Sequence, residues 1–534
     1  MMSTAETQSF RTLPKHQIVL TMAGVMLAMF MGSLDQTIVE TAMPRINADL
    51  GGFSHYTWII TVYIIASAIA VPIVGKLTDM YGRKRFYLGG IILFTLASIF
   101  SGLSQTLAEL IIFRGIQGLG AGAMMANAFI VISDIFPPAE RGKYQGLISG
   151  VFGVSAILGP ALGGIITDTF SWHWIFFINV PLGILIAILF VFFFPDIRPD
   201  TGLNKIDYPG MVTLSLGVIA LLLALSWAGG QYAWLSFPII ALLLFSLVML
   251  LAFLYVESRS ANPLIPFTLF RNRIVPIAEI SVFLTAVGMF AAITFIPLFF
   301  QGVLGATATI SGGFLTPMLL GQVTGSFISG QLLSRAGGHY RMQGFFGLLI
   351  MCVGVFLLTR MGPSTSYAAA IVNIVLTGFG LGMTMPLYTI AVQNAVPYSM
   401  LGVATSTVPF VRSVGASMGL AVFGSTMSSS FAKDFVTMLP QAVKDVLPAS
   451  IMEELAHNPK MLMSIEAQAD VKDVLMQASP QGEQLFEQLL QTLKEALSSS
   501  IHQIFVMAFI AVLVAIAVHL FIKEIPLRKG HDSA

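Results

Sequence analysis

The sequence predicts an all-α polytopic membrane protein. Of its 534 residues, 56% are hydrophobic and only 10% are charged, whereas about 25% of the residues of a typical soluble domain are charged. The apolar residues gather in long runs, and roughly 20 such residues cross a bilayer as a helix. A soluble core of this length could not bury so much apolar surface, so the composition indicates a chain that crosses the membrane many times.

Hydropathy predicts fourteen membrane-spanning helices, none of which resembles a cleaved signal segment. Their approximate limits are 17–43, 55–75, 86–103, 107–135, 144–168, 174–195, 208–227, 235–256, 274–300, 310–333, 342–360, 367–390, 403–428 and 501–522. With the N-terminus inside, most of the 27 Lys and Arg residues lie on the inner side, and the short outer loops hold only Arg45 and Arg360. This charge bias predicts a protein of the cell membrane with both termini in the cytoplasm.

The predicted spans divide into two six-helix bundles with two extra helices between them. A cytoplasmic segment (1–16) precedes the first bundle (17–200), the extra pair (201–258) and the second bundle (259–528). One long hydrophilic insertion, 428–500, lies on the outer side before the last span. Its apolar residues recur at helical spacing from Val443 to Ile451 and from Phe486 to Leu497. This pattern predicts a pair of amphipathic helices that fold as a hairpin over the outer mouth or lie on the membrane surface. A solvated spacer is the alternative.

A dense cluster of charge separates the second and third predicted spans. In Gly75–Arg85, Asp79 lies four residues before Arg83, and Gly75 and Gly82 allow close backbone approach or a positive φ. We expect a tight cytoplasmic turn here. Asp134 closes the fourth span and is expected to join Asp79 and Arg83 in a cluster that locks an inner gate, with a weak surface ion pair as the alternative. The pattern G-x-x-x-D-x-x-G-[RK]-[RK] resembles the loop signature of the major facilitator superfamily.

Asp35 is the clearest ionisable residue inside a predicted span. Carboxylates within a membrane are costly and usually face a cavity or a partner. Glu40 adds a second acid near the outer end of the same span. Arg114 falls in the outer half of the fourth span, as Asp35 does in the first, and is the candidate partner that holds Asp35 charged until substrate or a conformational change separates them. A permanent structural pair, or an Arg114 side chain that extends to the outer interface, is the alternative.

Two segments around these charges resemble motifs of drug:proton antiporters. Leu34–Pro44, L-D-Q-T-I-V-E-T-A-M-P, is similar to their first-helix signature L-D-x-T-I-V-N-x-A-L-P, with Glu40 in place of asparagine. The segment R-G-I-Q-G-L-G-A-G, which begins at Arg114, is similar to their fourth-helix motif. The resemblance implies that Asp35 is the principal proton-coupling acid, although Glu40 leaves open which of the two acids takes up the proton.

The fifth predicted span carries a proline and a set of glycines that resemble the G-P-x-x-G-G motif of the same superfamily. This motif marks its antiporters and is generally missing from its importers. The residues are Gly153, Gly159, Pro160, Gly163 and Gly164. Proline bends a helix, and glycines let another helix approach closely. In the superfamily this helix meets the tenth span between the two halves, so the resemblance implies a bearing and a seal against proton leak. A kinked, tightly packed helix is the alternative.

Glu279 and Arg412 form a second candidate pair near the cytoplasmic ends of the ninth and thirteenth spans. Glu279 is expected to be a second protonation site or a contact for cationic substrates, and a purely structural pair is an equal alternative. The net charge of +1 argues against nucleic acid as a partner. The chain lacks the nucleotide-binding motif G-x-x-x-x-G-K-[ST], so ATP is not the expected energy source. Its eight histidines do not have the spacing of metal ligands, so neither a metal nor another cofactor is expected. A proton gradient is the predicted energy source.

Together these features resemble the fourteen-span drug:proton antiporters of the QacA/EmrB type. The resemblance implies a monomeric transporter, not an enzyme, that alternates access to a midplane cavity. It would recognise varied apolar, cationic or amphipathic compounds loosely and expel them in exchange for protons. Two alternatives stay open: an exporter of one metabolite, lipid or siderophore, and a non-transporting membrane receptor or scaffold.

Overall fold

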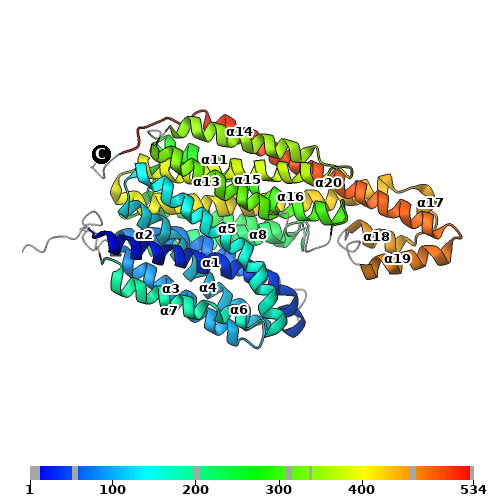
Figure 1. The fold of residues 1–534 in the computed structure, drawn as a ribbon, viewed down its shortest axis with the longest axis horizontal. Helices are drawn as coiled ribbons and strands as arrows, with labels where there is room; N and C mark the ends of the chain where they lie inside the picture. The colour runs from blue at the N-terminus through cyan, green and yellow to red at the C-terminus, as the bar shows by residue number, and fades with distance from the viewer. Residues whose placement is uncertain are drawn as a thin grey trace, which may run out of the picture.

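The computed structural model describes residues 13–50, 58–196, 205–229, 231–306, 315–335, 339–457 and 465–528. This part of the chain is almost entirely helical and forms no strand, apart from one isolated bridge between Ala228 and Tyr232. Figure 1 shows the helices running nearly parallel in two groups, with a smaller helical unit extending from one end.

The first bundle contains six membrane-crossing segments, the last of them made of two short helices. Its helices are α1 (Lys15–Leu50), α2 (Trp58–Tyr81), α3 (Arg83–Leu103), α4 (Leu107–Ile135), α5 (Pro138–Thr169), α6 (Trp174–Phe177) and α7 (Asn179–Phe193). α1 packs on α5 and α7, and α4 packs on α2 and α3. These six segments of the first bundle lie within residues 15–193.

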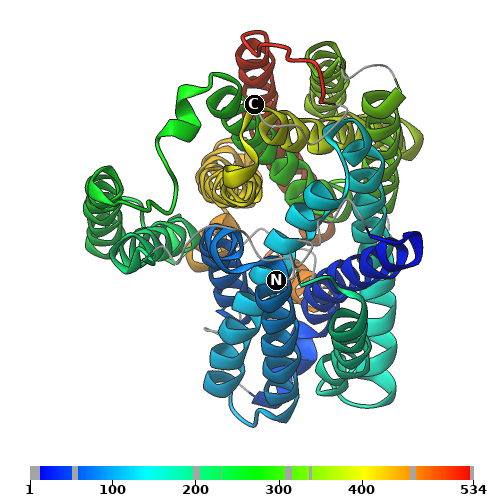
Figure 2. The ribbon, with the colours of Figure 1, turned by 90° about the vertical axis from the view of Figure 1, so that its left-hand side faces the viewer.

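The second bundle mirrors the first in its number of crossing segments. Its helices are α11 (Ile274–Gly302), α13 (Leu315–Arg335), α14 (Tyr340–Thr359), α15 (Tyr367–Ala395), the short 3-10 helix η3 (Tyr398–Met400), α16 (Leu401–Met438) and α20 (Gly482–His519). α15 packs between α13 and α14, and α11 packs against α16 and α20. Viewed end-on in Figure 2, the first bundle, coloured blue to teal, and the second bundle, coloured green to red, lie side by side.

The two extra helices form a separate pair at the seam between the bundles. α8 (Tyr208–Trp227) and α9 (Phe237–Arg259) pack on each other, and α8 also contacts α2 and α16, as the green pair in Figure 2 shows. The connector to the second bundle includes the short α10 (Thr268–Arg271). The buried carboxylate of Glu257 fixes this connector by accepting hydrogen bonds from the backbone N–H groups of Leu264 (2.9 Å) and Ile265 (3.2 Å).

Thirteen helices in the described part of the chain are long and apolar enough to cross a bilayer. The one predicted span outside these thirteen is the tenth, 310–333, which corresponds to α13, a helix 21 residues long but rich in glycine and polar residues. α13 packs between α15 and α5, so it is surrounded by protein on two sides. Its lower hydropathy follows from this position, because close helix packing favours small residues over large apolar ones.

The insertion before the last span is a packed helical unit. It contains α17 (Gln441–Lys444), α18 (Ala449–His457) and α19 (Ile465–Ala478), flanked by long extensions of α16 and α20. Figure 1 shows this orange unit projecting beyond the ends of the two bundles. The buried side chains of Phe435, Leu455, Leu475 and Leu489 belong to one apolar core that continues into the second bundle.

The structure corrects two details of the predicted hairpin. The segment with Phe486 and Leu497, expected as a separate amphipathic helix, is the first half of α20, which runs without a break through the last span. The earlier expected helix, around Val443 to Ile451, is divided between α17 and α18. The unit buries its apolar residues in a core that is continuous with that of the second bundle, and it projects outward instead of lying along the side of the bundles (Figure 1).

Leu489→Ala is expected to destabilise the insertion by about 2–5 kcal/mol, because it leaves a cavity in this core. Amide hydrogen exchange, read by mass spectrometry, should then quicken in α19 and in the first half of α20. Glu487→Ala is the matched control, since Glu487 is exposed on the same helix. Equal protection of these amides in the Leu489 variant and the control would show that the insertion is not held together by a common core.

Candidate functional site

Asp35 lies in a fully buried polar network inside the first bundle. Arg114 Nη1 lies 2.6 Å from Asp35 Oδ2, and Gln117 Nε2 donates to Asp35 Oδ1 at 2.9 Å. Asn179 Nδ2 donates to the same Oδ1 at 2.8 Å. The side chains of Asp35, Arg114, Gln117 and Asn179 are at most 1% exposed. The carboxylate is therefore shared between a cation and two neutral donors, and water does not reach it in this conformation.

Arg114 is held inside the bundle from several sides. Its guanidinium lies over the ring of Tyr63, 4.1 Å from the centroid, and 5.8 Å from the centroid of Phe176. Nη1 also donates to Gln117 Oε1 at 2.9 Å, whereas the buried Nε has no hydrogen-bond partner among the described residues. The interpretation in which Arg114 extends to the outer interface does not apply to this structure. The pairing with Asp35 that the sequence indicated is present.

Gln117 and Asn179 are members of this network that the sequence analysis did not identify. Gln117 follows Arg114 by three residues, which places both side chains on one face of α4. Asn179 is the first residue of α7 and also donates to Ser98 Oγ at 3.0 Å, and Ser98 in turn donates to the carbonyl of Phe176 at 2.9 Å. The amide side chain of Asn179, beside a strongly apolar run, is the sequence feature that indicates this site, because a buried amide needs a hydrogen-bond partner.

Glu40 lies outside the network. It is exposed on the surface of α1, beyond Asp35, and it accepts a hydrogen bond from Gln36, which is exposed on the same face. Asp35 and Glu40 thus occupy different environments on one helix. The buried position of Asp35 favours it as the acid that responds to a change in bundle conformation.

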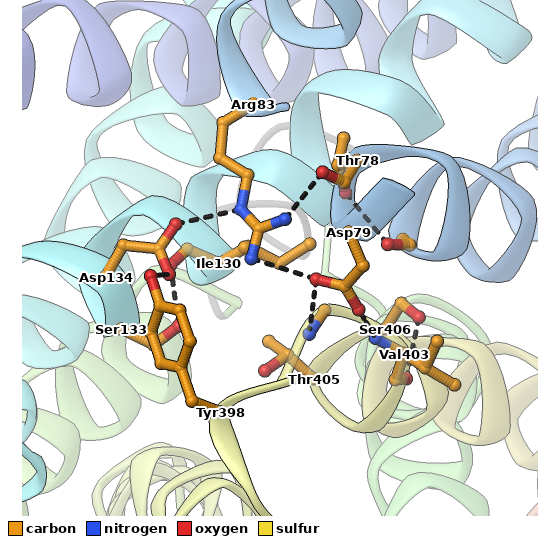
Figure 3. A network of polar contacts seen from close by, with 12 residues as sticks. Thr78, Asp79, Arg83, Ile130, Ser133, Asp134, Tyr398, Val403, Thr405 and Ser406 are labelled. Atoms are coloured by element: carbon orange, nitrogen blue, oxygen red, sulfur yellow. Dashed lines mark hydrogen bonds and ion pairs between the residues drawn. The ribbon is translucent and has the colours of Figure 1, made fainter. Parts of the chain in front are cut away.

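A second buried cluster lies at the α2–α3 turn, at the end of the bundles that we call the Gly82 end (Figure 3). Arg83 Nη2 lies 2.9 Å from Asp79 Oδ1, and Arg83 Nε lies 2.9 Å from Asp134 Oδ2. All three side chains are less than a tenth exposed, so the interpretation as an exposed ion pair does not fit. The structure brings together the three residues that the sequence placed in one cluster.

The turn itself is shorter than the sequence suggested. α2 continues through Gly75 and Asp79 to Tyr81, and Gly82 alone separates it from α3. Gly82 has a φ of 94°, a conformation that glycine adopts without strain. Asp79 therefore lies on the last turn of a rigid helix, which fixes its direction more firmly than a loop would.

Asp79 connects the first bundle to the second. Its two oxygens accept hydrogen bonds from the backbone N–H groups of Gly402 (3.2 Å) and Val403 (3.0 Å) at the start of α16. A carboxylate at a helix N-terminus is stabilised by the unpaired N–H groups and by the helix dipole. The approach is close because of two glycines: a Cβ at Gly75 would collide with Ser406, and one at Gly402 would collide with Asp79.

Further hydrogen bonds across the bundles lie near this cluster. Tyr398 donates to Asp134 Oδ1 at 2.9 Å. Arg141 donates to the carbonyl of Phe136 at 2.9 Å, at the end of α4, and reaches Gln393 Oε1 of the second bundle at 3.2 Å. Hydrogen bonds join α2, α4 and α5 to the second bundle in the half of the molecule next to the Gly82 end. The described structure is therefore closed at the Gly82 end.

The sequence predicts that the glycines of the α5 motif face the second bundle, but only some of them do. A Cβ at Gly153 would meet Val323 of α13, which agrees with the expected contact between halves. A Cβ at Gly159 would instead collide with Thr37, and one at Gly163 would crowd Ile38, both on α1 of the same bundle. Gly164 meets nothing within 4 Å.

Pro160 lies inside α5 without ending it. Nearer the start of α5, two further glycines lie against the second bundle: Gly142 against the backbone of Gly330, and Gly146 against that of Phe327. Gly159 and Gly163 thus pack against α1, the helix that carries Asp35. Contact with α13 of the second bundle is made by Gly153 and, about two to three turns earlier in α5, by Gly146 and Gly142.

Gly159→Ala is expected to destabilise the protein by about 1–3 kcal/mol, because the new methyl group has no room beside Thr37. The thermal unfolding midpoint of the purified protein in detergent measures this loss. Gly164→Ala is the matched control within the same motif: its methyl group meets no atom, and alanine favours the helix. Equal midpoints for the two variants would contradict the close packing of α5 on α1.

Glu279 and Arg412 do not form the expected ion pair. Glu279 Oε1 accepts a hydrogen bond from Thr407 at 2.5 Å, and its buried Oε2 has no hydrogen-bond partner within the residues described. No ion pair within 4.0 Å joins Glu279 to Arg412 in the described structure. Arg412 instead lines a small pocket between α11, α15 and α16, together with Thr285 and Tyr388. No group of His, Cys, Asp and Glu in the described ranges has the arrangement of a metal site.

Comparisons with known proteins agree with this architecture. The sequence model described as Major Facilitator Superfamily matches residues 25–206 and 210–420. The chain is 41% identical over 428 residues to "Multidrug transporter protein MdtP" of Bacillus subtilis (strain 168), which covers 80% of this chain and 77% of the relative. It is also 41% identical over 408 residues to "Multidrug resistance protein 3" of the same strain, with 76% and 79% covered.

A solved structure extends the agreement to the fold. The human organic anion transporter MFSD10 aligns with a TM-score of 0.59 at 12% identity, over 94% of this chain and 100% of that chain. At this identity the match concerns the fold alone. Because the family model covers most of the chain and two relatives exceed 40% identity over three quarters of it, the chain belongs to the Major Facilitator Superfamily, a family of membrane transporters and not of enzymes.

Proposed function

We propose that this multi-pass membrane protein is a proton-coupled antiporter that expels apolar, cationic or amphipathic compounds of several kinds. The names of two relatives at 41% identity refer to multidrug transport and resistance, which supports a drug efflux role. We further propose that it acts as a monomer in the cell membrane, with both termini and the Gly82 end in the cytoplasm. Small substrates, protons and the lipid bilayer are its proposed partners, and no cofactor takes part.

The observation that carries the proposal is the buried carboxylate of Asp35. Removing one partner from a buried ion pair costs about 3–5 kcal/mol, because the other charge is left without compensation. Protonation of Asp35 would therefore weaken its hold on Arg114 and favour a rearrangement of α1 and α4. A cation in the cavity would act in the opposite direction, by stabilising the ionised carboxylate. Proton and cationic substrate would then compete for one charge, as exchange requires.

The cluster at the Gly82 end supplies the second part of the mechanism. We propose that closure of this end belongs to the outward-facing part of the cycle, in which substrate is released. The Asp35 carboxylate is shielded from water in the conformation described and must become accessible before it takes up a proton. To load substrate from the cytoplasm, the N–H groups of Gly402 and Val403 must leave Asp79, and Tyr398 must leave Asp134. Arg83 would keep the two carboxylates together on the first bundle while the second bundle moves away.

Transport by the purified protein in proteoliposomes with an imposed pH gradient tests the proposal. We expect several unrelated cations, ethidium and tetraphenylphosphonium among them, to accumulate against their gradients, and we expect dissipation of the pH gradient to stop this accumulation. Movement of a single compound would identify a specialised exporter of a metabolite, lipid or siderophore. Absence of any flux would favour a receptor or scaffold, and uphill flux without a pH gradient would contradict proton coupling.

A further inference from the structure

His519 is a buried titratable residue that the proposed mechanism does not use. It ends α20 at the Gly82 end of the second bundle, and its side chain is fully buried. Its Nδ1 lies 3.0 Å from the hydroxyl oxygen of Tyr388 on α15. Its Nε2 lies 2.8 Å from the backbone carbonyl of Arg341 in the first turns of α14. Both ring nitrogens therefore have a partner, on two different helices.

The partners decide which nitrogen carries hydrogen in the neutral ring. A carbonyl oxygen can only accept, so Nε2 must be the N–H that donates to Arg341. Nδ1 is then unprotonated, and the Tyr388 hydroxyl donates to it. Gly344 fixes the ring in this position, because a Cβ at residue 344 would collide with the imidazole. The neutral imidazole therefore has one lone pair that can take up a proton, on Nδ1, and this lone pair accepts the hydrogen bond of Tyr388.

Tyr388 also belongs to the pocket between α11, α15 and α16. The pocket wall includes Tyr388, Arg412, Thr285 and Thr384. A change in the protonation of His519 therefore changes the hydrogen-bond direction of a group in the pocket wall, although His519 itself does not line the pocket.

Several of the charged groups near His519 are bonded to other partners. Arg341 directs its guanidinium to the carbonyl of Leu520, at 3.0 Å, and Glu524 in the following segment binds His339, at 2.7 Å. On α11, Glu279 is hydrogen-bonded to Thr407. The remaining charged or titratable groups on the neighbouring segments are Arg412 on α16, Lys523 after α20, and Tyr340 and Tyr388. Among the described residues, no carboxylate is hydrogen-bonded to the imidazole.

We propose that His519 and Tyr388 form a second proton-binding site, whose protonation state selects between hydrogen-bond donors and acceptors on the cargo. A hydronium ion in the pocket gives a proton to the Tyr388 oxygen while the original hydroxyl proton moves to His519 Nδ1. Two O–H bonds break, one in the hydronium ion and the original one in Tyr388. A new Tyr388 O–H bond and a new Nδ1–H bond form, a water molecule is left in the pocket, and the positive charge rests on the imidazolium. Tyr388 remains neutral throughout.

The two states present different groups to a ligand. With neutral His519, the hydroxyl hydrogen of Tyr388 is tied to Nδ1, and the free lone pair of its oxygen accepts a hydrogen bond. With protonated His519, Nδ1–H donates to that oxygen, and the hydroxyl hydrogen turns away from the imidazole as a donor. A cation that carries N–H groups therefore binds the neutral state better and is released when the proton arrives. The inference rests on the proposed function only in that exported cations must enter this pocket.

The test compares two cations on the purified full-length protein in detergent. Ethidium carries N–H donors, whereas tetraphenylphosphonium carries none, so the difference between their pH dependences isolates hydrogen bonding from charge. We expect ethidium affinity to fall, relative to tetraphenylphosphonium, by up to about tenfold per pH unit on the acid side of the imidazole pKa, since one proton is exchanged. Tyr388→Phe and His519→Gln should remove this difference, and His519→Gln retains an amide donor for the Arg341 carbonyl.

Tyr87→Phe is the matched control, because Tyr87 is a buried tyrosine whose hydroxyl has no hydrogen-bond partner among the described residues. Its pH dependence should equal that of the parent protein. If His519→Gln does not fold, histidine NMR signals are followed against pH in the parent and in Tyr388→Phe. In the parent, the titration midpoint of one histidine signal should change when ethidium binds. In Tyr388→Phe it should not change. A retained ethidium difference in Tyr388→Phe, or no such titration shift in the parent, overturns the inference.

The failure of this inference and that of the proposed function give different results. If ethidium is still exported in exchange for protons but its binding is unaffected at Tyr388 and His519, only the second site is wrong. If the protein binds neither cation, the proposed function itself fails.

Discussion

Asp35→Asn is expected to reduce the pH-driven export of cations by about 100-fold or more, which corresponds to about 2.7 kcal/mol. The substitution keeps the size of the side chain and one acceptor oxygen for Arg114 and Gln117, but it removes the group that exchanges a proton. Binding of uncharged compounds should change little, because the effect concerns charge and not shape. Initial rates of ethidium uptake into inverted proteoliposomes under an imposed pH gradient measure the loss.

Asp49→Asn provides the control for a change of charge on the same helix. Asp49 is an exposed residue near the end of α1, where it accepts a hydrogen bond from the indole of Trp172 at 2.8 Å. We expect near-parental transport from this variant. Full pH-driven export by Asp35→Asn would assign the proton to another acid, with Glu40 and Glu279 as the next candidates.

Gly75→Leu is expected to prevent the Gly82 end from closing and so to reduce transport to near the background rate. Even a Cβ at residue 75 would collide with Ser406 on α16, and the larger side chain would also separate Asp79 from the N–H groups of Gly402 and Val403. The protein should then accumulate in the state open at this end. A cysteine placed at Ser326, on a Cys352→Ser background, reports the change by its reaction with a membrane-impermeant thiol reagent.

The reporter position follows from the structure. Ser326 is buried and its hydroxyl lies 2.7 Å from that of Ser149 across the bundle interface, so it should react slowly in the parent and at least about tenfold faster in the Gly75 variant. Gly89→Leu is the control, because a Cβ at Gly89 meets no atom within 4 Å. If both variants reacted equally slowly, the contact of α2 with α16 would not be what closes this end.

The sequence predicted the class of fold and several contacts for reasons that are local. Long apolar runs locate spans without tertiary information, and a rare charge within such a run must find a partner. Asp35 and Arg114 could therefore be paired from their matching depth in two spans, and Asp79, Arg83 and Asp134 from their common end of the membrane. The sequence does not single out the partners Gln117 and Asn179 in the same way, because a neutral amide costs less to bury than a charge and finds partners more easily.

Other features depend on packing that a single sequence does not specify. Close approach of helices could be predicted for the α5 glycines, but whether Gly159 faces α1 or α13 depends on the rotation of α5 within the bundle. The charge of the segment after Gly75 suggested a loop, although its buried residues continue the helix as far as Tyr81. Between Leu497 and Ile501 there is no glycine or proline, so α20 continues where a boundary had been expected.

The most direct test of the central claim is to record protons while substrate alone supplies the driving force. Proteoliposomes loaded with ethidium, with equal pH on both sides and a pH-sensitive dye inside, should show proton movement opposite to the ethidium efflux, and Asp35→Asn should abolish the proton signal. Ethidium efflux that proceeds at the same rate without any change of internal pH would contradict exchange at this buried carboxylate.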